Sequence, residues 1–384
     1  MRALVVASTD SQLKRAYAIA RSIIDGVGSI DVVVHPTRST ASQRVVDSIA
    51  GQEWQKKPFH AIVRDGCIFN FDIVVVLLLG KEMAEFNIEI RESFTRLSPQ
   101  RRPIVISGFP GTLYGEYIEH SLPRLGVDYL LTTSTRELKA IRSGLEAAGY
   151  DSSSLFLYEQ FGPENSTRAT SCDTVVDVVT FAVQNVVPLD RERRLYTAVR
   201  LLEYAEHFPD RQVVVKVRQT PGEKTRHADR FPFPTLFADI ARSRKIPPNL
   251  VVSADPMDDI LTATQLLLTY SSTAAFEALA HGVKVAIISD LGIAEGLGNH
   301  IFIGSGLLKS FDSLLSDEIC SPSLDWLRDN GFGNADTGCD LRWQIEDLLE
   351  EQRISGRAID FPYCYAEGST FFAWSRSPEY ERQL

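Results

Sequence analysis

The chain has 384 residues, of which 44% are hydrophobic and 23% are charged, a composition typical of globular enzymes rather than of disordered or fibrous proteins. Its length exceeds what one hydrophobic core usually supports, so we expect two domains. The longest apolar run, Ile73–Leu79, is too short to cross a bilayer and predicts a strand buried on both faces. The formal net charge of −10 argues against non-specific binding of nucleic acid.

An acidic chain needs local cations to bind an anionic ligand. Two segments are rich in basic residues, Arg91–Arg102 and Arg211–Arg230, and both are candidate anion sites. The five cysteines are scattered without CxxC spacing, which predicts reduced, mostly buried thiols and neither a disulfide framework nor a zinc site. The apolar stretch at the start of the chain ends at Ser8, too early for a signal peptide, so we expect a cytoplasmic protein.

The first half of the chain alternates short apolar strands with amphipathic helices. The predicted strands are Ala3–Ala7, Asp31–His35, Ile73–Leu79, Ile104–Ser107 and Tyr129–Thr132. The predicted helices are Ser11–Asp25, Ala41–Ile49, Lys81–Arg96, Thr112–Leu122 and Arg136–Ala148. Continuous apolar strands separated by helices indicate a parallel sheet covered on both faces.

The pattern restarts after the polar segment Gly162–Thr167, which we interpret as a linker. The second set of predicted strands is Val175–Ala182, Gln212–Val217, Leu250–Ser253, Gln265–Thr269 and Lys284–Ser289. The helices between them are Arg191–His207, Pro234–Arg244, Asp258–Ala263 and Ala274–His281. The sequence therefore predicts two Rossmann-like, doubly wound α/β domains, residues 1–162 and 168–320, that face a central cleft.

Residues 321–384 form a third predicted segment. It contains the expected helices Ser323–Asn330 and Asp340–Gln352, followed by the aromatic-rich stretch Asp360–Trp374. Isolated aromatic side chains are usually buried, so we expect this segment to pack back on the body of the protein. The alternative is an exposed aromatic patch that contacts a partner, or the inner face of the membrane peripherally.

A candidate anion site follows the strand Gln265–Thr269. Ligands of open α/β sheets bind at the carboxyl ends of the strands, and a helix start offers backbone N–H groups and a positive dipole end to a phosphate. Glu277, one turn into the helix, is placed to accept hydrogen bonds from ribose hydroxyls. The alternative is an ordinary serine cap with a solvated glutamate. The predicted nucleotide-binding residues are Tyr270, Ser271, Ser272, Thr273 and Glu277.

The stretch Leu268–Ile287 resembles the donor-binding helix of GT-B glycosyltransferases, whose Glu-Ala-x-Ala-x-Gly-x-Pro signature contacts the nucleotide; Lys284 stands where that signature has Pro. The serine pair also resembles the Ser-Ser/Thr motif of bacterial sialyltransferases and Kdo transferases, which binds the phosphate of a CMP-linked sugar. Those enzymes carry a His-Pro motif after an earlier strand, and this chain has none there. Lys216 and Arg218 follow the corresponding strand and are predicted to supply the positive charge instead.

Inverting sugar transfer needs a general base, which the resemblance to GT-B enzymes assigns to the N-terminal domain. The candidates, in order, are Asp10 after the first strand, Glu116 in a glycine-rich turn, and Asp65, which resembles the sialyltransferase acidic motif at one position. His35 is a further candidate, although a turn histidine is the simpler interpretation. The sequence has no Asp-x-Asp and no cluster with metal-ligand spacing, so we predict neither a metal nor a cofactor.

These features together predict an inverting, metal-independent glycosyltransferase that uses a nucleotide sugar as substrate. The first choice of donor is a CMP-linked sialic acid-like or Kdo-like sugar, and the acceptor is expected to be a surface glycan or a glycolipid. Two other enzyme classes share the architecture, CDP-glycerol-type polyol-phosphate transferases and sugar-nucleotide 2-epimerases. A non-catalytic nucleotide- or glycan-binding protein is the remaining alternative, because fold alone does not fix chemistry.

Overall fold

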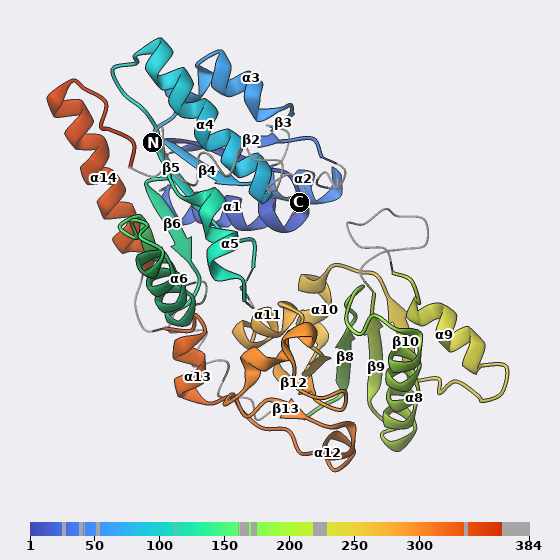
Figure 1. Ribbon diagram of the computed structural model, residues 1–384. Coiled ribbons are helices and arrows are strands. Elements are labelled where there is room, and N and C mark those ends of the chain that lie inside the picture. The colour runs from blue at the N-terminus through green and yellow to red at the C-terminus, as the bar shows by residue number, and fades with distance from the viewer. Residues whose placement is uncertain are drawn as a thin grey trace. The chain divides into compact units, whose positions relative to one another are not determined.

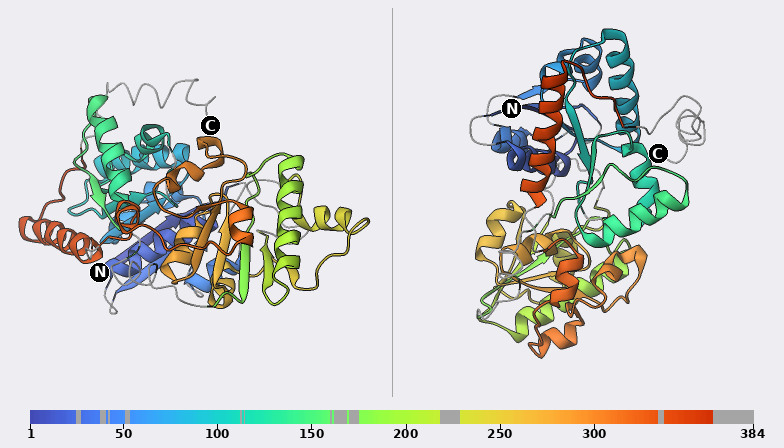
Figure 2. Two further views of the ribbon diagram at one scale, coloured as in Figure 1. Left: turned by 90° about the horizontal axis from the view of Figure 1, so that it is seen from below. Right: turned by 90° about the vertical axis from the view of Figure 1, so that its left-hand side faces the viewer.

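A computed structural model describes residues 1–24, 28–37, 41, 43–50, 54–111, 113, 115–159, 161, 169, 175–217, 229–333 and 337–362. The chain divides into two compact units, Met1–Gln160 with Ala335–Leu384, and Phe161–Asn334. Each unit is built around one parallel sheet (Figure 1), and helices cover both faces of each sheet in the further views of Figure 2. The predicted fold class, two doubly wound α/β domains, is confirmed.

The sheet of the first unit has seven strands in the order β3-β2-β1-β4-β5-β6-β7. Five of them follow the sequence prediction within a few residues. The other two, β3 and β7, have three residues each and are too short to produce a detectable apolar pattern. The strands are β1 Arg2–Ala7, β2 Ser29–Val34, β3 Trp54–Lys56, β4 Ile73–Leu77, β5 Ile104–Gly108, β6 Tyr129–Thr132 and β7 Leu155–Leu157.

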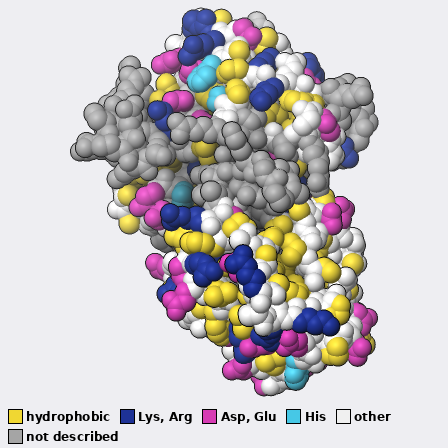
Figure 3. Space-filling view, turned by 90° about the vertical axis from the view of Figure 1, so that its right-hand side faces the viewer, with side chains coloured by type: hydrophobic (Ala, Val, Ile, Leu, Met, Phe, Trp, Pro, Cys, Tyr) yellow, Lys and Arg dark blue, Asp and Glu magenta, His cyan; other side chains and the backbone are white. Residues whose placement is uncertain are grey.

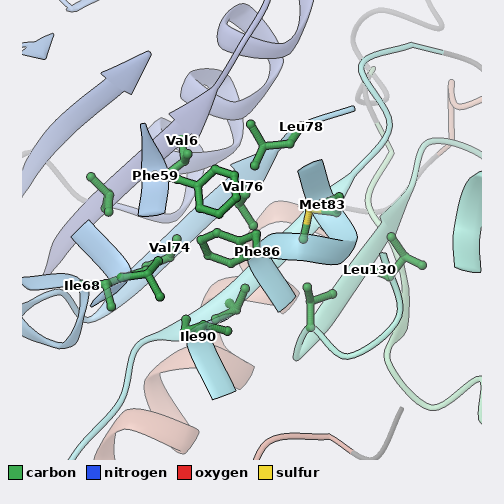
Figure 4. Close-up of a cluster of buried hydrophobic side chains, with 14 of the residues drawn as sticks. Val6, Phe59, Ile68, Val74, Val76, Leu78, Met83, Phe86, Ile90 and Leu130 are labelled. Atoms are coloured by element: carbon green, nitrogen blue, oxygen red, sulfur yellow. The ribbon is translucent and has the colours of Figure 1, made fainter. Parts of the chain in front are cut away.

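Helices cover the two faces of this sheet because its strands are apolar on both sides. Leu4 and Val6 face a core shared with α3 and α4, while Val5 faces a core shared with α1 and α14. Figure 4 shows the first of these cores, in which Phe59 and Phe86 pack on the central strands. The helices are α1 Asp10–Ile23, α2 Gln43–Ala50, α3 Phe59–Arg64, η1 Cys67–Asn70, α4 Gly80–Leu97, α5 Tyr117–Ser121, η2 Leu122–Arg124, α6 Thr135–Ala147 and α14 Thr337–Ser355.

The sheet of the second unit has six strands in the order β10-β9-β8-β11-β12-β13. The strands are β8 Val178–Ala182, β9 Gln212–Lys216, β10 Leu250–Ser253, β11 Leu266–Thr269, β12 Lys284–Ile288 and β13 Leu308–Lys309. The helices are α8 Arg191–His207, α9 Phe233–Ile240, α10 Met257–Ala263, α11 Ala274–Ala280, η3 Glu295–Leu297, η4 Asn299–Phe302, α12 Phe311–Leu315 and α13 Leu324–Asp329.

Both sheets have a point at which the chain changes its direction of growth across the sheet. In the first unit the chain adds β2 and β3 on one side of β1 and then returns to place β4 on the other side. In the second unit β9 and β10 lie on one side of β8, and β11 lies on the other. The connections on either side of such a switch point diverge, so the carboxyl ends of these strand pairs are where ligands bind in open sheets.

The C-terminal segment is divided between the units, which differs from the predicted boundary at residue 320. Helix α13 belongs to the second unit, whereas α14 belongs to the first and buries Leu341 and Ile345 against α1. Beyond it, the Phe361 ring meets the Phe94 ring edge-on with centroids 5.3 Å apart. The described part of the tail therefore packs on the protein. Residues 363–384 lie outside the described residues, so membrane contact by the aromatic tail stays a prediction.

The basic segment Arg91–Arg102 does not form the predicted anion site. Arg102 is 1% exposed, and its guanidinium donates two hydrogen bonds of 2.7 Å to the carboxylate of Asp128. It also donates to the carbonyls of Ile359 and Asp360, while Arg91 donates to that of Pro362 at 2.6 Å. The prediction was wrong because these arginines hold the C-terminal segment against the first unit.

The second basic segment, Arg211–Arg230, is in part neutralised within its own unit. Arg211 forms two hydrogen bonds of 2.8 Å with Asp317, and residues 218–228 lie outside the described residues. Nearby ion pairs join α8 to α9, between Arg191 and Asp239, and to the turn after α9, between Glu206 and Arg244. Figure 3 shows basic and acidic side chains intermingled on this unit rather than one continuous basic patch.

The cysteines differ from the expectation of mostly buried thiols. Cys67, Cys320 and Cys339 are exposed thiols outside any disulfide, and the other two cysteines lie outside the described residues. A search of the described helices finds none with the length and apolar character needed to span a membrane.

Replacing Arg102 with Met should lower the free energy of unfolding of the first unit by about 3–5 kcal/mol, because Asp128 would lose its partner in a buried site. The matched control is Arg101→Met next to it, whose ion pair with Asp72 is exposed and should contribute less than about 1 kcal/mol. Urea denaturation, with hydrogen exchange of residues 359–361 as a local readout, checks both values. Equal losses in the two variants would contradict the anchoring role of Arg102.

Candidate functional site

The switch point of the second sheet carries a serine bound to a glutamine. Gln184 follows β8 and Ser271 follows the neighbouring strand β11. The Ser271 backbone N–H donates to Gln184 Oε1 at 3.0 Å, and Gln184 Nε2 donates to Ser271 Oγ at 3.2 Å. Ser271 is 3% exposed. The hydrogen bonds therefore join the two strand ends where the sheet opens.

Buried Arg194 of α8 fixes the position of Gln184. Its guanidinium donates to the Gln184 carbonyl at 2.5 Å and to the Pro188 carbonyl at 2.8 Å. The same group forms a buried ion pair of 2.9 Å with Asp229. Burial lowers the pKa of Arg194, and the charge of Asp229 opposes that effect. The loop after β8 is thus held by charge-assisted hydrogen bonds rather than by apolar packing alone.

The loop after β12 lies against Ser271 through a glycine. Gly298 has φ of +70°, and a Cβ added to it would lie 2.9 Å from Ser271 Oγ. Buried Asn299 shapes the loop by donating to the Gly292 carbonyl at 2.9 Å and accepting from the Ala294 N–H at 3.0 Å. Position 298 therefore requires glycine both for its backbone angle and for its close approach to the serine.

The turn that leads into α11 has fewer available N–H groups than the sequence suggests. Helix α11 has seven residues. The N–H of Ser271 donates to Gln184 Oε1, that of Ser272 to Thr269 Oγ1, and that of Ala274 to Ser272 Oγ. The N–H groups of Ala275 and Phe276 donate to the carbonyls of Ser272 and Thr273. The prediction of several free N–H groups at a helix tip was therefore wrong. The hydroxyls of partly buried Ser272 and exposed Thr273 are the accessible polar groups of this turn.

Tyr270 is a core residue rather than a surface of the site. It is 1% exposed, and its hydroxyl lies 2.7 Å from Thr197 Oγ1 of α8. Burial raises the pKa of Tyr270 strongly. Its side chain continues the alternation of β11 and points to the same face as Leu266 and Leu268. The prediction that the Tyr270 side chain binds the nucleotide is corrected by this burial.

The remaining predicted residues of the second unit lie at the same edge of the sheet. Lys216 ends β9, is 8% exposed and donates from Nζ to the Val217 carbonyl at 2.5 Å. Glu277 is partly buried in the first turn of α11. Arg218 lies outside the described residues. Lys216, the serine turn and Glu277 thus follow β9 and β11, the two strands on either side of β8.

The first sheet has a comparable pair at its own switch point. Ser8 follows β1, and its hydroxyl donates to Glu82 Oε2 at 3.1 Å. Glu82 lies in the first turn of α4 after β4, and the same oxygen accepts from the Leu79 N–H at 3.2 Å. Asp10, the first predicted base, is partly exposed at the start of α1, two residues after Ser8. Sequence reasoning missed Glu82, which a correct strand order would have placed beside β1.

The other two predicted bases lie in different surroundings. Asp65 follows α3 and lines a groove of about 900 Å³ together with Met1, Asp72 and Arg101, which precede strands, so it lies at the amino-terminal edge of the sheet. A helix of a β-α-β unit ends at that edge, and this position contradicts a role for Asp65 at the carboxyl ends. Glu116, in left-handed backbone with φ of 49°, has a side chain that is 78% exposed and lies 3.7 Å from His120.

His35 is held as a neutral acceptor. Its Nδ1 accepts the Phe59 N–H at 3.3 Å, and burial, with a smaller effect of His60, lowers the pKa of its ring. This contact supports the simpler interpretation of a turn histidine that joins β2 to α3. No group of three or more His, Cys, Asp or Glu side chains among the described residues is arranged to hold a metal ion.

The comparison with protein families decides the relationship of the chain. Residues 3–348 match the model of the family described as "Putative glycosyltransferase (DUF6716)". The chain belongs to this family. A search of curated proteins gave no match.

Solved structures similar to this member of the glycosyltransferase family share its fold. A "putative UDP-N-acetylglucosamine 2-epimerase" from Listeria monocytogenes is 15% identical with a TM-score of 0.56, and the match covers 95% of this chain and 99% of that one. The UDP-GlcNAc 2-epimerase from Neisseria meningitidis bound to UDP-GlcNAc is 13% identical with a TM-score of 0.51, covering 91% and 100%. UGT89C1 of Arabidopsis thaliana complexed with UDP is 10% identical with a TM-score of 0.50, covering 91% and 99%. At these identities the likeness shows the GT-B-like fold alone.

The contact between Gly298 and Ser271 gives a test with an internal control. Gly298→Ala should destabilise the second unit by about 1–3 kcal/mol more than Gly292→Ala, because both residues have positive φ but only the first meets Ser271. Thermal unfolding of the two variants measures the difference. Equal destabilisation would show that the loop does not press on the serine.

Proposed function

We propose that this chain transfers a sugar from a nucleotide-sugar donor to an acceptor hydroxyl, and that the second unit binds the nucleotide at the β8–β11 switch point. The observation that carries the proposal is the Gln184–Ser271 pair, which fixes the serine turn at the opening of the sheet. Membership of the glycosyltransferase family and the fold of the second unit support it.

The hydroxyls of the turn are the proposed phosphate contacts. Ser272 Oγ accepts the Ala274 N–H at 3.3 Å, so its own proton can be donated to a phosphate oxygen. Thr273 offers a second exposed hydroxyl. Lys216 supplies positive charge from the neighbouring strand end, and Glu277 is the proposed partner of the ribose hydroxyls. Hydrogen bonds to a charged phosphate are stronger than neutral ones, which suits a site built from few donors.

Asp10 of the first unit is the proposed general base. The acceptor hydroxyl would lose its proton to this carboxylate while its oxygen attacks the anomeric carbon and the nucleotide leaves with the electrons of the broken bond, which inverts the configuration. Glu82 accepts hydrogen bonds from the Ser8 hydroxyl and the Leu79 N–H, and it is proposed to position the turn that carries Asp10. Hydroxyl donors and Lys216 would stabilise the leaving phosphate without a metal.

The identity of the donor follows from which nucleotide binds. The Neisseria and Arabidopsis proteins were solved with UDP-GlcNAc and with UDP, so a UDP-linked sugar is the first donor to test. A CMP-linked sugar remains the prediction from the serine motif. Product analysis by NMR separates sugar transfer from 2-epimerisation and from polyol-phosphate transfer, and a protein that binds nucleotide without turnover would be a sensor.

Ser272→Ala should weaken nucleotide binding about tenfold, equivalent to about 1.4 kcal/mol, because one hydrogen bond to phosphate is lost. Isothermal titration with UDP, CMP and GDP measures the change. Ser253→Ala, at the end of β10 on the same edge, is the matched control and should bind as the wild type. The proposal fails if none of the three nucleotides binds the wild type, or if both variants bind equally well.

Asp10→Asn should reduce kcat by about 10²–10⁴-fold and leave nucleotide affinity within twofold, because the base acts only during proton transfer. Glu116→Gln is the comparison, since its exposed side chain is already paired with His120 and should change kcat by less than about threefold. Steady-state kinetics with the donor identified by titration gives both values. A larger loss in Glu116→Gln than in Asp10→Asn would reassign the base.

A further inference from the structure

One arginine of the first unit has two buried guanidinium nitrogens without a hydrogen-bond acceptor. Nε and Nη2 of Arg136, the second residue of α6, have no partner among the described residues. The buried guanidinium groups of Arg102, Arg124 and Arg194 donate instead to carboxylates or carbonyls. A desolvated cation without acceptors is unfavourable, so an acceptor from outside the chain would be bound well by Arg136.

The neighbouring carboxylate of Glu137 accepts from other donors than Arg136. Glu137 is fully buried. Its Oε1 accepts the Leu113 N–H at 2.8 Å, and its Oε2 accepts the N–H and the hydroxyl of Thr133 at 2.8 and 2.7 Å. These bonds fix the loop after β5 to the carboxyl end of β6, so Arg136 extends from a rigid wall rather than from a free helix end.

A second cation stands at the same strand end. The guanidinium of Arg15, from α1, lies over the ring of Tyr158 with 5.3 Å to its centroid. The Tyr158 N–H donates at 2.9 Å to the carbonyl of Thr132, the last residue of β6 and the neighbour of Thr133. No hydrogen bond from Arg15 to an acceptor is found in the described part of the chain. Burial lowers the pKa of Arg15, and the charge of Glu137 opposes this change, which agrees with their proximity.

The accessible wall beside these arginines comes from the turn before α5. Burial raises the pKa of Tyr117, at the start of that helix, and nearby Arg136 opposes the rise. Glu116 precedes it in left-handed backbone with φ of 49°. Two guanidinium groups and a phenol thus surround one end of β6, on the unit that we expect to bind the acceptor.

We propose that Arg15 and Arg136 form a subsite for an anionic group, a phosphate or a carboxylate, carried by the acceptor. The assignment of this anion to the acceptor rests on the proposed transferase function, whereas the anion site itself does not depend on that function. Planar guanidinium groups match the paired oxygens of both anions, and two of them within a chain of net charge −10 would select an acidic acceptor. The acceptor class is therefore an acidic or phosphate-bearing glycan rather than a neutral one.

The binding test uses inorganic phosphate and acetate on the whole chain with ¹⁵N-labelled arginine, so that each guanidinium reports on itself. Phosphate should shift the Arg136 and Arg15 Nε signals, assigned by Arg136→Gln and Arg15→Gln, and each variant should weaken phosphate binding at least tenfold. Arg142→Gln, exposed on the same helix, is the matched control and should bind as the wild type. A stronger response to acetate would identify a carboxylate acceptor, and no response of either arginine to either anion overturns the proposal.

Stability separates a ligand-binding role from a structural one. Because Nε and Nη2 of Arg136 have no hydrogen-bond partner among the described residues, Arg136→Gln should leave the melting temperature unchanged or raise it. A melting temperature lowered by several degrees would show that the side chain supports the fold and would overturn the proposal. Nucleotide binding should be the same in Arg136→Gln and the wild type. Loss of nucleotide binding in Ser272→Ala therefore tests the transferase proposal, and loss of phosphate binding in Arg136→Gln tests this subsite.

Discussion

A parallel sheet opens only where two adjacent strands send their connections to opposite sides, and this constraint sets where the proposed site lies. In the first unit the opening lies between β1 and β4, and in the second between β8 and β11. Ser8 follows β1 and forms a hydrogen bond with Glu82. Ser271 follows β11 and forms a hydrogen bond with Gln184. Each pair joins strand ends that would otherwise diverge, so the polar groups around them are held in place before any ligand arrives.

The architecture could be predicted from the sequence because each local signal agreed with the fold. Helix Arg191–His207 was predicted with both ends correct, since Asp190 caps it and its apolar positions recur at helical spacing. The buried strands were found as continuous apolar runs. Strands β3, β7 and β13 were missed because two or three residues carry no period. The boundary at residue 320 was placed early because packing of α14 on α1 is a long-range choice that no local pattern encodes.

The position of the serine turn could be predicted from the sequence, but its contacts could not. The serine turn was located correctly after β11, yet Tyr270 was assigned to it although Leu266, Leu268 and Tyr270 share one face of the strand. That period of two was a usable signal. The occupied N–H groups of the turn could not be inferred, because they depend on the geometry of α11. Glu82, Gln184 and the unpaired Arg136 became visible only when the strand order brought distant segments together.

The central claim is that the β8–β11 opening of the second sheet receives the phosphate of a nucleotide. A crystal structure of the chain in complex with UDP or CMP tests it most directly, because the phosphate gives strong electron density and its position does not depend on which sugar the donor carries. The account predicts a phosphate oxygen within about 3 Å of Ser272 Oγ, the distance of an O–H···O⁻ hydrogen bond. A nucleotide bound in the groove at the amino-terminal edge of the first sheet, with the serine turn unoccupied, would contradict it.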